Sequence, residues 1–260
     1  MRLSAFVITC DRPRVLRACL KRLQFVDELI VVDKGRIGLS PDEPVTDRLD
    51  KYERVAWSPV VEDTRAHAQS LCTGDYILCL DDDEIISRNS AEAIPQAIAH
   101  AHDIAVWQIP IHHWILGRFD ERAYAPEWRP ALYRRGAVSY EPIVHAGTRI
   151  NCDRREMGGL DNIWIDHLSH PDIATYLEKT NRYTAQQQRC GIQWSNGLHL
   201  REYALWRVAQ IDSYPDQGVQ AVQLMRALYE VVDLAKRWEE TQPSGRATFD
   251  AFCEAVEQED

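Results

Sequence analysis

The sequence predicts an α/β protein whose mixed, mainly parallel sheet is flanked by helices and followed by a helical extension. In the first hundred residues, short apolar runs such as residues 3–10 and 76–80 alternate with segments of helical period. That alternation is typical of βαβ units around a parallel sheet. From Pro171 onward the helical period continues without another such run. We therefore expect a sheet-containing part at 1–170 and a helical part at 171–260.

The sheet-containing part begins with a strand followed by a helix. Leu3 to Cys10 forms the apolar run, and Pro13 fits the first position of a helix that extends to about Gln24. Further strands are expected at 28–33, 54–57, 76–80 and 104–111, and further helices at 64–71 and 90–102. Residues 112–160 are expected to be irregular, with short strands, as in a variable substrate-facing region.

The helical part is predicted to contain helices near 171–190, 197–212, 217–239 and 246–257. In the third of these, one apolar stripe is expected to be buried: Leu224, Leu228, Val231, Ala235 and Trp238. No linker rich in glycine, serine or proline precedes these helices. We therefore expect them to pack on the first part and to form the acceptor side or a homodimer contact.

Composition excludes several classes of protein. The 260 residues include 40 acidic and 30 basic side chains, a formal charge of −10, which repels nucleic acid and anionic lipid. No apolar run approaches the roughly 20 residues of a membrane span, and the start has no signal-peptide pattern, so we expect a cytoplasmic protein without a transmembrane segment. Seven cysteines without a Cys-x-x-Cys pair argue against a disulfide framework and a thiolate zinc site.

Four consecutive carboxylates, Asp81 to Glu84, follow the apolar run 76–80. Like charges so close together repel, and a divalent cation such as Mg²⁺ or Mn²⁺ would relieve the repulsion. In an open α/β sheet, ligands bind at this end of the strands. A solvated acidic turn explains the same pattern equally well. A calcium loop is disfavoured because Ile86 stands where that loop requires glycine.

Together with the first strand and helix, Val31-Val32-Asp33, Arg65 and Leu80-Asp81-Asp82-Asp83-Glu84 occur in an order that resembles glycosyltransferase family 2, of the GT-A fold. The closest likeness is to bacterial lipopolysaccharide-core and other cell-surface sugar transferases, and it covers residues 1 to about 150. The resemblance implies a hexosyl or related transferase. Its donor would be a nucleoside-diphosphate sugar, with UDP expected, and its acceptor a saccharide or a lipid-linked hydroxyl. It also implies inversion and dependence on Mn²⁺ or Mg²⁺.

The same resemblance assigns roles to individual residues. Asp33 would recognise the base, the segment after the first strand would line the same pocket, and Arg65 would lie near the base or phosphates. The residues expected to hold the donor are Thr9, Asp11, Asp33, Arg65, Asp81 and Asp82. The residues expected to hold the metal are Asp81, Asp83 and His145.

An inverting transfer also needs a carboxylate base for the acceptor hydroxyl. We rank Glu127 first and Glu141 second. Of the adjacent pair His112 and His113, at most one is expected to face the site, because neighbouring strand residues point to opposite faces.

Two departures from the family pattern leave a second hypothesis open. The family usually continues from the second strand into a Gly-Ser-x-Asp-like loop, whereas Lys34-Gly35-Arg36-Ile37-Gly38 follows here, and Ala146 replaces a glutamate expected after His145. A catalytically lapsed sugar-nucleotide-binding or scaffold protein of the same fold is therefore the alternative. A nucleotidyltransferase ranks lower, because no glycine-rich loop follows the first strand.

Overall fold

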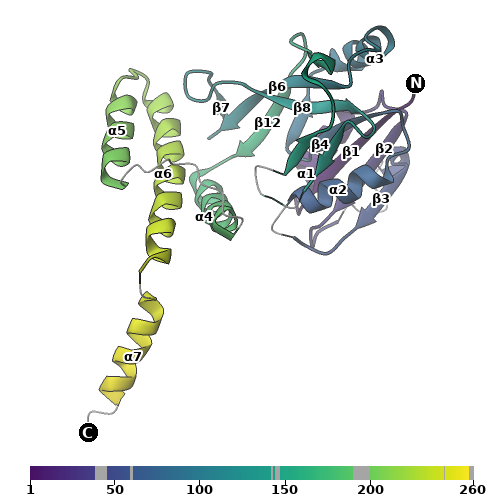
Figure 1. The fold of residues 1–260 in the computed structure, drawn as a ribbon. Helices are drawn as coiled ribbons and strands as arrows, with labels where there is room; N and C mark the ends of the chain where they lie inside the picture. The colour runs from purple at the N-terminus through teal and green to yellow at the C-terminus, as the bar shows by residue number, and fades with distance from the viewer. Residues whose placement is uncertain are drawn as a thin grey trace. The chain divides into compact units, whose positions relative to one another are not determined.

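The chain forms two compact units in the computed structural model shown in Figure 1. The structure describes residues 1–38, 46–58, 61–141, 143, 147–189, 200–242 and 244–257. Met1–Ile173 holds a mixed sheet with its flanking helices, and Ala174–Asp260 is helical where it is described. The α/β fold class predicted from the sequence is therefore confirmed.

The first unit is built on one large sheet. In the described residues its strands are β1 Leu3–Thr9, β2 Glu28–Asp33, β3 Lys51–Arg54, β4 Tyr76–Asp81, β5 Glu84–Ile86, β6 Val106–Ile115, β7 Arg118–Phe119, β8 Glu127–Arg134, β11 Met157–Gly159 and β12 Ile165–His170. A small second sheet pairs β9 Val138–Tyr140 with β10 Thr148–Ile150. The helices of this unit are α1 Pro13–Arg22, α2 Val61–Leu71 and α3 Ser90–His100.

The strand order brings the carboxyl ends of several strands to one edge of the sheet. The main path runs β3-β2-β1-β4-β8-β6-β12-β5, and β7 and β11 also pair with β6. The first four strands are mutually parallel, β8 runs antiparallel between β4 and β6, and β12 is parallel to β6. As a result, the carboxyl ends of β2, β1, β4, β6 and β12 share one edge with the amino end of β8.

Two apolar layers hold the helices on opposite faces of the sheet. Alternate residues of β1 enter different layers, with Val7 in the layer of α1 and α3 and Phe6 in the layer of α2. Burial on both faces explains why the strands read as continuous apolar runs. Leu20 of α1 is fully buried, which contributes roughly 2 kcal/mol to folding. These layers fix the sheet edge that carries the polar side chains.

Two expectations about the strands need correction. The third strand lies at Lys51–Arg54, earlier than the expected 54–57. The supposedly irregular region contains β8, eight residues long, of which only Ala131 to Tyr133 are buried. Its charged first half and Pro130 break the apolar pattern, so the sequence does not show that β8 is inserted between β4 and β6.

The helical unit contains α4 Ile173–Arg189, α5 Leu200–Asp212, α6 Gln217–Glu240 and α7 Gly245–Glu257. The expectation of a buried stripe on α6 is wrong, because Leu224 is 47% exposed and Trp238 is 62% exposed. The buried residues of α6 are instead Val219, Val222, Gln223, Ala227 and Asp233. Helix α6 packs beside α5 (Figure 1). Helix α6 has apolar residues on two of its faces, and residue spacing does not reveal which face packs against a neighbouring helix.

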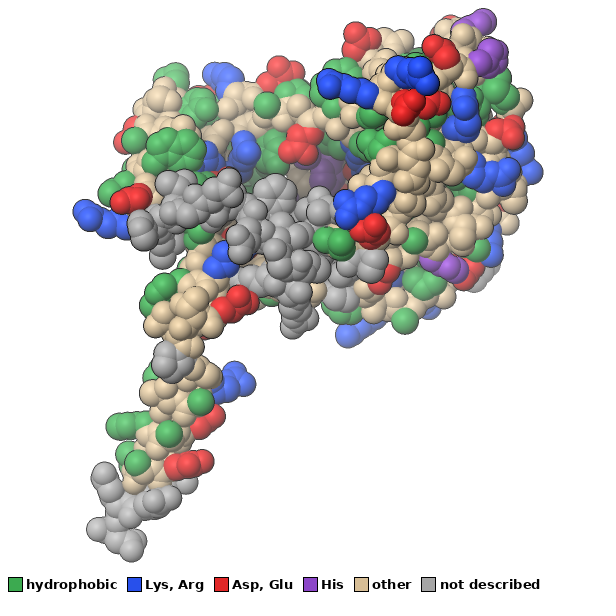
Figure 2. All heavy atoms as spheres, in the orientation of Figure 1, with side chains coloured by type: hydrophobic (Ala, Val, Ile, Leu, Met, Phe, Trp, Pro, Cys, Tyr) green, Lys and Arg blue, Asp and Glu red, His purple; other side chains and the backbone are tan. Residues whose placement is uncertain are grey.

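The surface mixes charges and apolar side chains. Figure 2 shows acidic and basic side chains interspersed on the visible face, with hydrophobic side chains along α7. Phe249 and Phe252 of that helix are 72% and 70% exposed. Among the helices in the described part of the chain, none is long and apolar enough to cross a membrane.

Candidate active site

Three of the predicted donor residues end neighbouring strands. Thr9 of β1 is in register with Asp33 of β2, and Ile8 is in register with Asp81 of β4. Because β2, β1 and β4 are parallel, their carboxyl ends meet at the sheet edge where ligands of open α/β folds bind. The structure therefore brings Thr9, Asp33 and Asp81 to one edge, as their positions after apolar runs predict.

Asp82 joins the ends of β1 and β4. Its side chain is 0% exposed, and its Oδ2 accepts hydrogen bonds from the Thr9 hydroxyl at 2.7 Å and the Cys10 backbone N–H at 3.3 Å. Its Oδ1 pairs with the Arg12 guanidinium. Burial raises the pKa of Asp82 to about 7, and the nearby Asp83 carboxylate adds to the effect of burial, while Arg12 opposes it. Both oxygens of Asp82 are thus used within the protein.

Arg12 bridges two of the aspartates. One terminal nitrogen pairs with Asp82 and the other with Asp83, and the Arg12 side chain is 36% exposed. Burial lowers the pKa of Arg12, but the Asp83 and Asp82 carboxylates outweigh that effect and hold the pKa above its ordinary value. The sequence places Arg12 near the donor pocket but gives no sign of this bridge.

Asp81 is paired with Arg65 yet keeps one unused oxygen. Its Oδ2 accepts a hydrogen bond of 2.6 Å from Arg65, and its backbone N–H donates to Glu84 at 2.8 Å. Burial raises the pKa of Asp81, but the positive charges of Arg65 and Arg129 outweigh burial. The pKa of Asp81 therefore lies below its usual range. Within the described residues, the buried Asp81 Oδ1 and Arg65 Nε have no hydrogen-bond partner. A buried acceptor and a buried donor are therefore left unsatisfied at this end of the sheet.

The carboxylates partly fit a divalent cation. Oxygen is the ligand that Mg²⁺ and Mn²⁺ prefer, and the unused Asp81 Oδ1 offers such a ligand. Among the described residues, no three His, Cys, Asp or Glu side chains are grouped so that they could hold a metal ion. A bound cation would therefore need phosphate oxygens or water to complete its shell. His145, the expected third ligand, lies outside the described residues.

Asp33 and Asp11 organise the loop of residues 34–38, which follows β2. The Asp33 carboxylate accepts hydrogen bonds from the Tyr52 hydroxyl at 2.5 Å and the Gly35 backbone N–H at 2.7 Å. Asp11 has a positive φ of 56°, and its Oδ1 accepts from the Ile37 backbone N–H at 2.6 Å. A Cβ on Gly35 would lie 2.5 Å from the Asp11 backbone nitrogen. Gly35 therefore allows the loop to approach the end of β1.

The two candidate bases occupy different surroundings. Glu127 begins β8 at the functional edge and is 60% exposed, with the Tyr124 hydroxyl 3.4 Å from its Oε1. Glu141 pairs with Arg149 at 2.7 Å beside the small sheet, and the hydrogen bond from Arg149 lowers its pKa. An ion-paired carboxylate is a weaker base. The geometry therefore favours Glu127 over Glu141.

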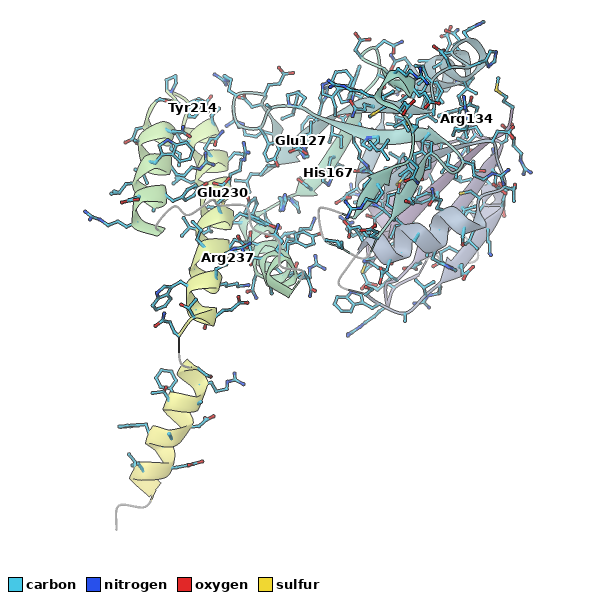
Figure 3. The ribbon with its side chains drawn as sticks, in the orientation of Figure 1. Glu127, Arg134, His167, Tyr214, Glu230 and Arg237 are labelled. Atoms are coloured by element: carbon cyan, nitrogen blue, oxygen red, sulfur yellow. The ribbon has the colours of Figure 1, made fainter. Side chains whose placement is uncertain are left out.

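Two histidines lie at this end of the sheet: His113, one of the adjacent pair considered from the sequence, and His167, which the sequence did not assign to the site. His113 of β6 is in register with His167 of β12. The His113 Nε2 is 3.7 Å from Glu127, and the His167 Nε2 is 3.8 Å from Asp83. Figure 3 labels Glu127 and His167 at this end of the sheet. His112 instead stacks on Phe119 with ring centroids 4.3 Å apart. Only one of the adjacent pair thus faces the site, as strand alternation predicts.

Comparison with known proteins gives relatives but no family model, since none matches the chain. An uncharacterized glycosyltransferase of Rickettsia felis is 28% identical over 200 residues, which cover 72% of this chain and 69% of the relative. One of Rickettsia conorii is 27% identical over 204 residues, which cover 72% of this chain and 70% of that protein. The solved structure of a Pyrobaculum calidifontis mannosyltransferase in complex with GDP-Man and Mn²⁺ is 12% identical, covers 98% of this chain and 80% of its own, and has a TM-score of 0.45. The sequence similarity thus extends well beyond the aspartate cluster.

Proposed function

We propose that the chain is a glycosyltransferase of the family 2 type that moves a hexosyl or related sugar from UDP to a hydroxyl acceptor. The acceptor is a saccharide or a lipid-linked glycan of cell-surface polysaccharide or lipopolysaccharide synthesis. The observation that carries this proposal is the pair of unused buried atoms, Asp81 Oδ1 and Arg65 Nε, at the shared ends of β1, β2 and β4. The Rickettsia relatives, which are named glycosyltransferases, support the same class.

The chain's own residues divide the donor between two regions. In this proposal Asp33 and the loop beside Asp11 hold the nucleoside, because their carboxylates and backbone surround the ends of β1 and β2. Arg65 and Arg12 face the diphosphate, since guanidinium groups suit phosphate oxygens. A divalent cation held by Asp81 and Asp83 would supply further positive charge against the leaving diphosphate.

Transfer requires one proton to move and one bond to be exchanged. Glu127 accepts the proton of the acceptor hydroxyl, and the freed oxygen attacks the anomeric carbon on the side opposite the diphosphate. The bond from that carbon to the phosphate oxygen breaks as the new bond forms, and the configuration inverts. Negative charge develops on the diphosphate, where Arg65 and Arg12 stabilise it. The 60% exposure of Glu127 leaves it accessible to an acceptor from solvent.

A binding protein that has lost turnover is the second candidate, and the Arg12 bridge favours it. Arg12 pairs with both Asp82 and Asp83 within the chain, so these carboxylates are less available to a cation. A nucleotide could bind beside this internally paired cluster without productive transfer. The two candidates differ in one measurement, the release of UDP from a UDP-sugar in the presence of acceptor.

The donor assignment is tested by calorimetry with UDP in Mn²⁺ and in a chelator. We expect affinity to fall about tenfold or more in the chelator and in Asp81→Asn, a loss of at least about 1.4 kcal/mol. The control is Asp103→Asn, which changes an exposed carboxylate and should bind UDP like the wild type. Equal affinity with and without Mn²⁺ would remove the cation from the proposal. A preference for adenosine or cytidine nucleotides would overturn the uridine assignment alone.

A further inference from the structure

A row of polar atoms connects the aspartate cluster with Glu127. The Nδ1 atoms of His113 and His167 are 3.2 Å apart, and the two rings meet edge to face with centroids 5.3 Å apart. At one end, the His167 Nε2 lies 3.8 Å from the Asp83 Oδ2. At the other end, the His113 Nε2 lies 3.7 Å from the Glu127 Oε2. The two rings therefore span the distance between the end of β4 and the start of β8.

His113 is the rigid member of its contact with Glu127. The His113 side chain is 11% exposed, whereas that of Glu127 is 60% exposed. The Tyr124 ring packs on His113 with centroids 4.3 Å apart, and the Tyr124 hydroxyl lies 3.4 Å from the Glu127 Oε1. An exposed glutamate samples several rotamers, so the fixed imidazole and hydroxyl select those that face the site.

The contact between the two rings restricts where the hydrogens lie. Of two Nδ1 atoms in hydrogen-bond contact, one must donate and the other accept. The His113 Nε2 faces a carboxylate, which only accepts, so a neutral His113 donates from Nε2 and accepts at Nδ1. His167 then donates from its Nδ1, and because its Nε2 also faces a carboxylate, that of Asp83, it donates at both ends only when both of its ring nitrogens carry a hydrogen. Within the described residues the buried His113 Nε2 makes no hydrogen bond, and a small rotation of Glu127 would provide one.

We propose that His113 is a positioning residue that orients the Glu127 carboxylate for proton transfer, and that His167 links this orientation to Asp83. The inference rests on the proposed function, because Glu127 acts as a base only there. Asp83 lies on the donor side and Glu127 on the acceptor side, so the two histidines connect the two halves of the reaction. His113 touches neither substrate and acts only through Glu127.

The first test compares three variants by steady-state kinetics. His113→Phe keeps a ring against Tyr124 but removes both nitrogens, and we expect kcat to fall about 10- to 100-fold with an unchanged donor KM. His113→Gln returns an amide donor near the Nε2 position and should restore most of the loss. The matched control is His112→Phe on the opposite face of the same strand, which should leave both constants unchanged. A loss in His113→Phe that appears in donor KM, or that the glutamine variant does not restore, would overturn the positioning role.

A double-mutant cycle separates positioning from a general structural effect. If His113 acts only through Glu127, then His113→Phe should cost nothing further in a Glu127→Gln background. Additive losses in the double variant would contradict the proposal. The melting temperature of each variant identifies any that lose the fold. If His113→Phe does not fold, His113→Gln is compared with the wild type in its place.

A second readout does not depend on activity. Nitrogen NMR of the imidazole rings should show His113 protonated at Nε2 and not at Nδ1, and Glu127→Gln should shift the His113 signals but not those of His112. Protonation at the His113 Nδ1 would refute the proposed contact between His113 and Glu127. His113 signals that do not change in Glu127→Gln would refute it as well. If the wild type transfers sugar from no nucleoside-diphosphate donor, the proposed function fails. The NMR result still decides whether His113 contacts Glu127.

Discussion

Asp82→Asn tests whether a buried carboxyl group in the aspartate cluster keeps its proton. The side chain is 0% exposed, and burial raises its pKa to about 7. An aspartate in the unfolded chain has a pKa of about 3.9. Because the folded pKa is the higher of the two, the stability that this group contributes is complete below about pH 4. It is lost as the pH rises through about 7.

The magnitude follows from the difference in pKa. Each pKa unit corresponds to about 1.4 kcal/mol, so about three units remove about 4 kcal/mol of folding free energy between about pH 4 and pH 7. Asparagine cannot ionise and avoids this loss. Its amide nitrogen would face the Cys10 backbone N–H across a contact of 3.3 Å, and two opposed donors cost about 1 kcal/mol. The variant should therefore match the wild type near pH 5 and exceed its stability by about 3 kcal/mol at pH 8.

Urea unfolding followed by circular dichroism at pH 5 and pH 8 measures this difference. Asp103→Asn serves as the control, because that carboxylate is exposed and its loss should leave the pH dependence unchanged. An Asp82→Asn protein destabilised by the same amount at both pH values would refute the reasoning. It would show that Asp82 is ionised in the fold and held by the Arg12 guanidinium.

Three further predictions address the site, the loop and the helical part. Asp83→Ala should abolish sugar transfer while leaving circular dichroism and the melting temperature close to those of the wild type, and an unfolded variant would indicate a structural role. Gly35→Ala should destabilise the protein by about 1–3 kcal/mol, because its Cβ would meet the backbone of Asp11. Gly245→Ala, with no atom within 4 Å of the new Cβ, is its control. Equal melting temperatures for Gly35→Ala and Gly245→Ala would contradict the steric argument. Truncation after His170 should lower solubility, since we expect the helical part to pack on the first; a soluble, fully active truncation would defeat this.

Local patterns in the sequence predicted most of the elements of the first unit. The start of α1 at Pro13 and the buried residues Leu16 and Leu20 follow from proline geometry and helical spacing. The strands β1, β2 and β4 were also predictable from the sequence, because strands buried on both faces form continuous apolar runs. Strand β8 and the buried face of α6 were not predicted correctly. Both depend on which neighbour covers a segment, and residue spacing carries no such information.

The sequence by itself determined that Asp33 and Asp81 would lie at one edge, because each ends an apolar run and parallel strands align their carboxyl ends. Only the tertiary structure decided what surrounds them. Arg12 reaches Asp82 and Asp83 across about seventy residues of chain. His113 meets His167 because β6 and β12 are neighbours in the sheet. The physical reason is that strand ends follow from local burial patterns, whereas contacts between side chains depend on strand order and register, which arise only when distant segments pair.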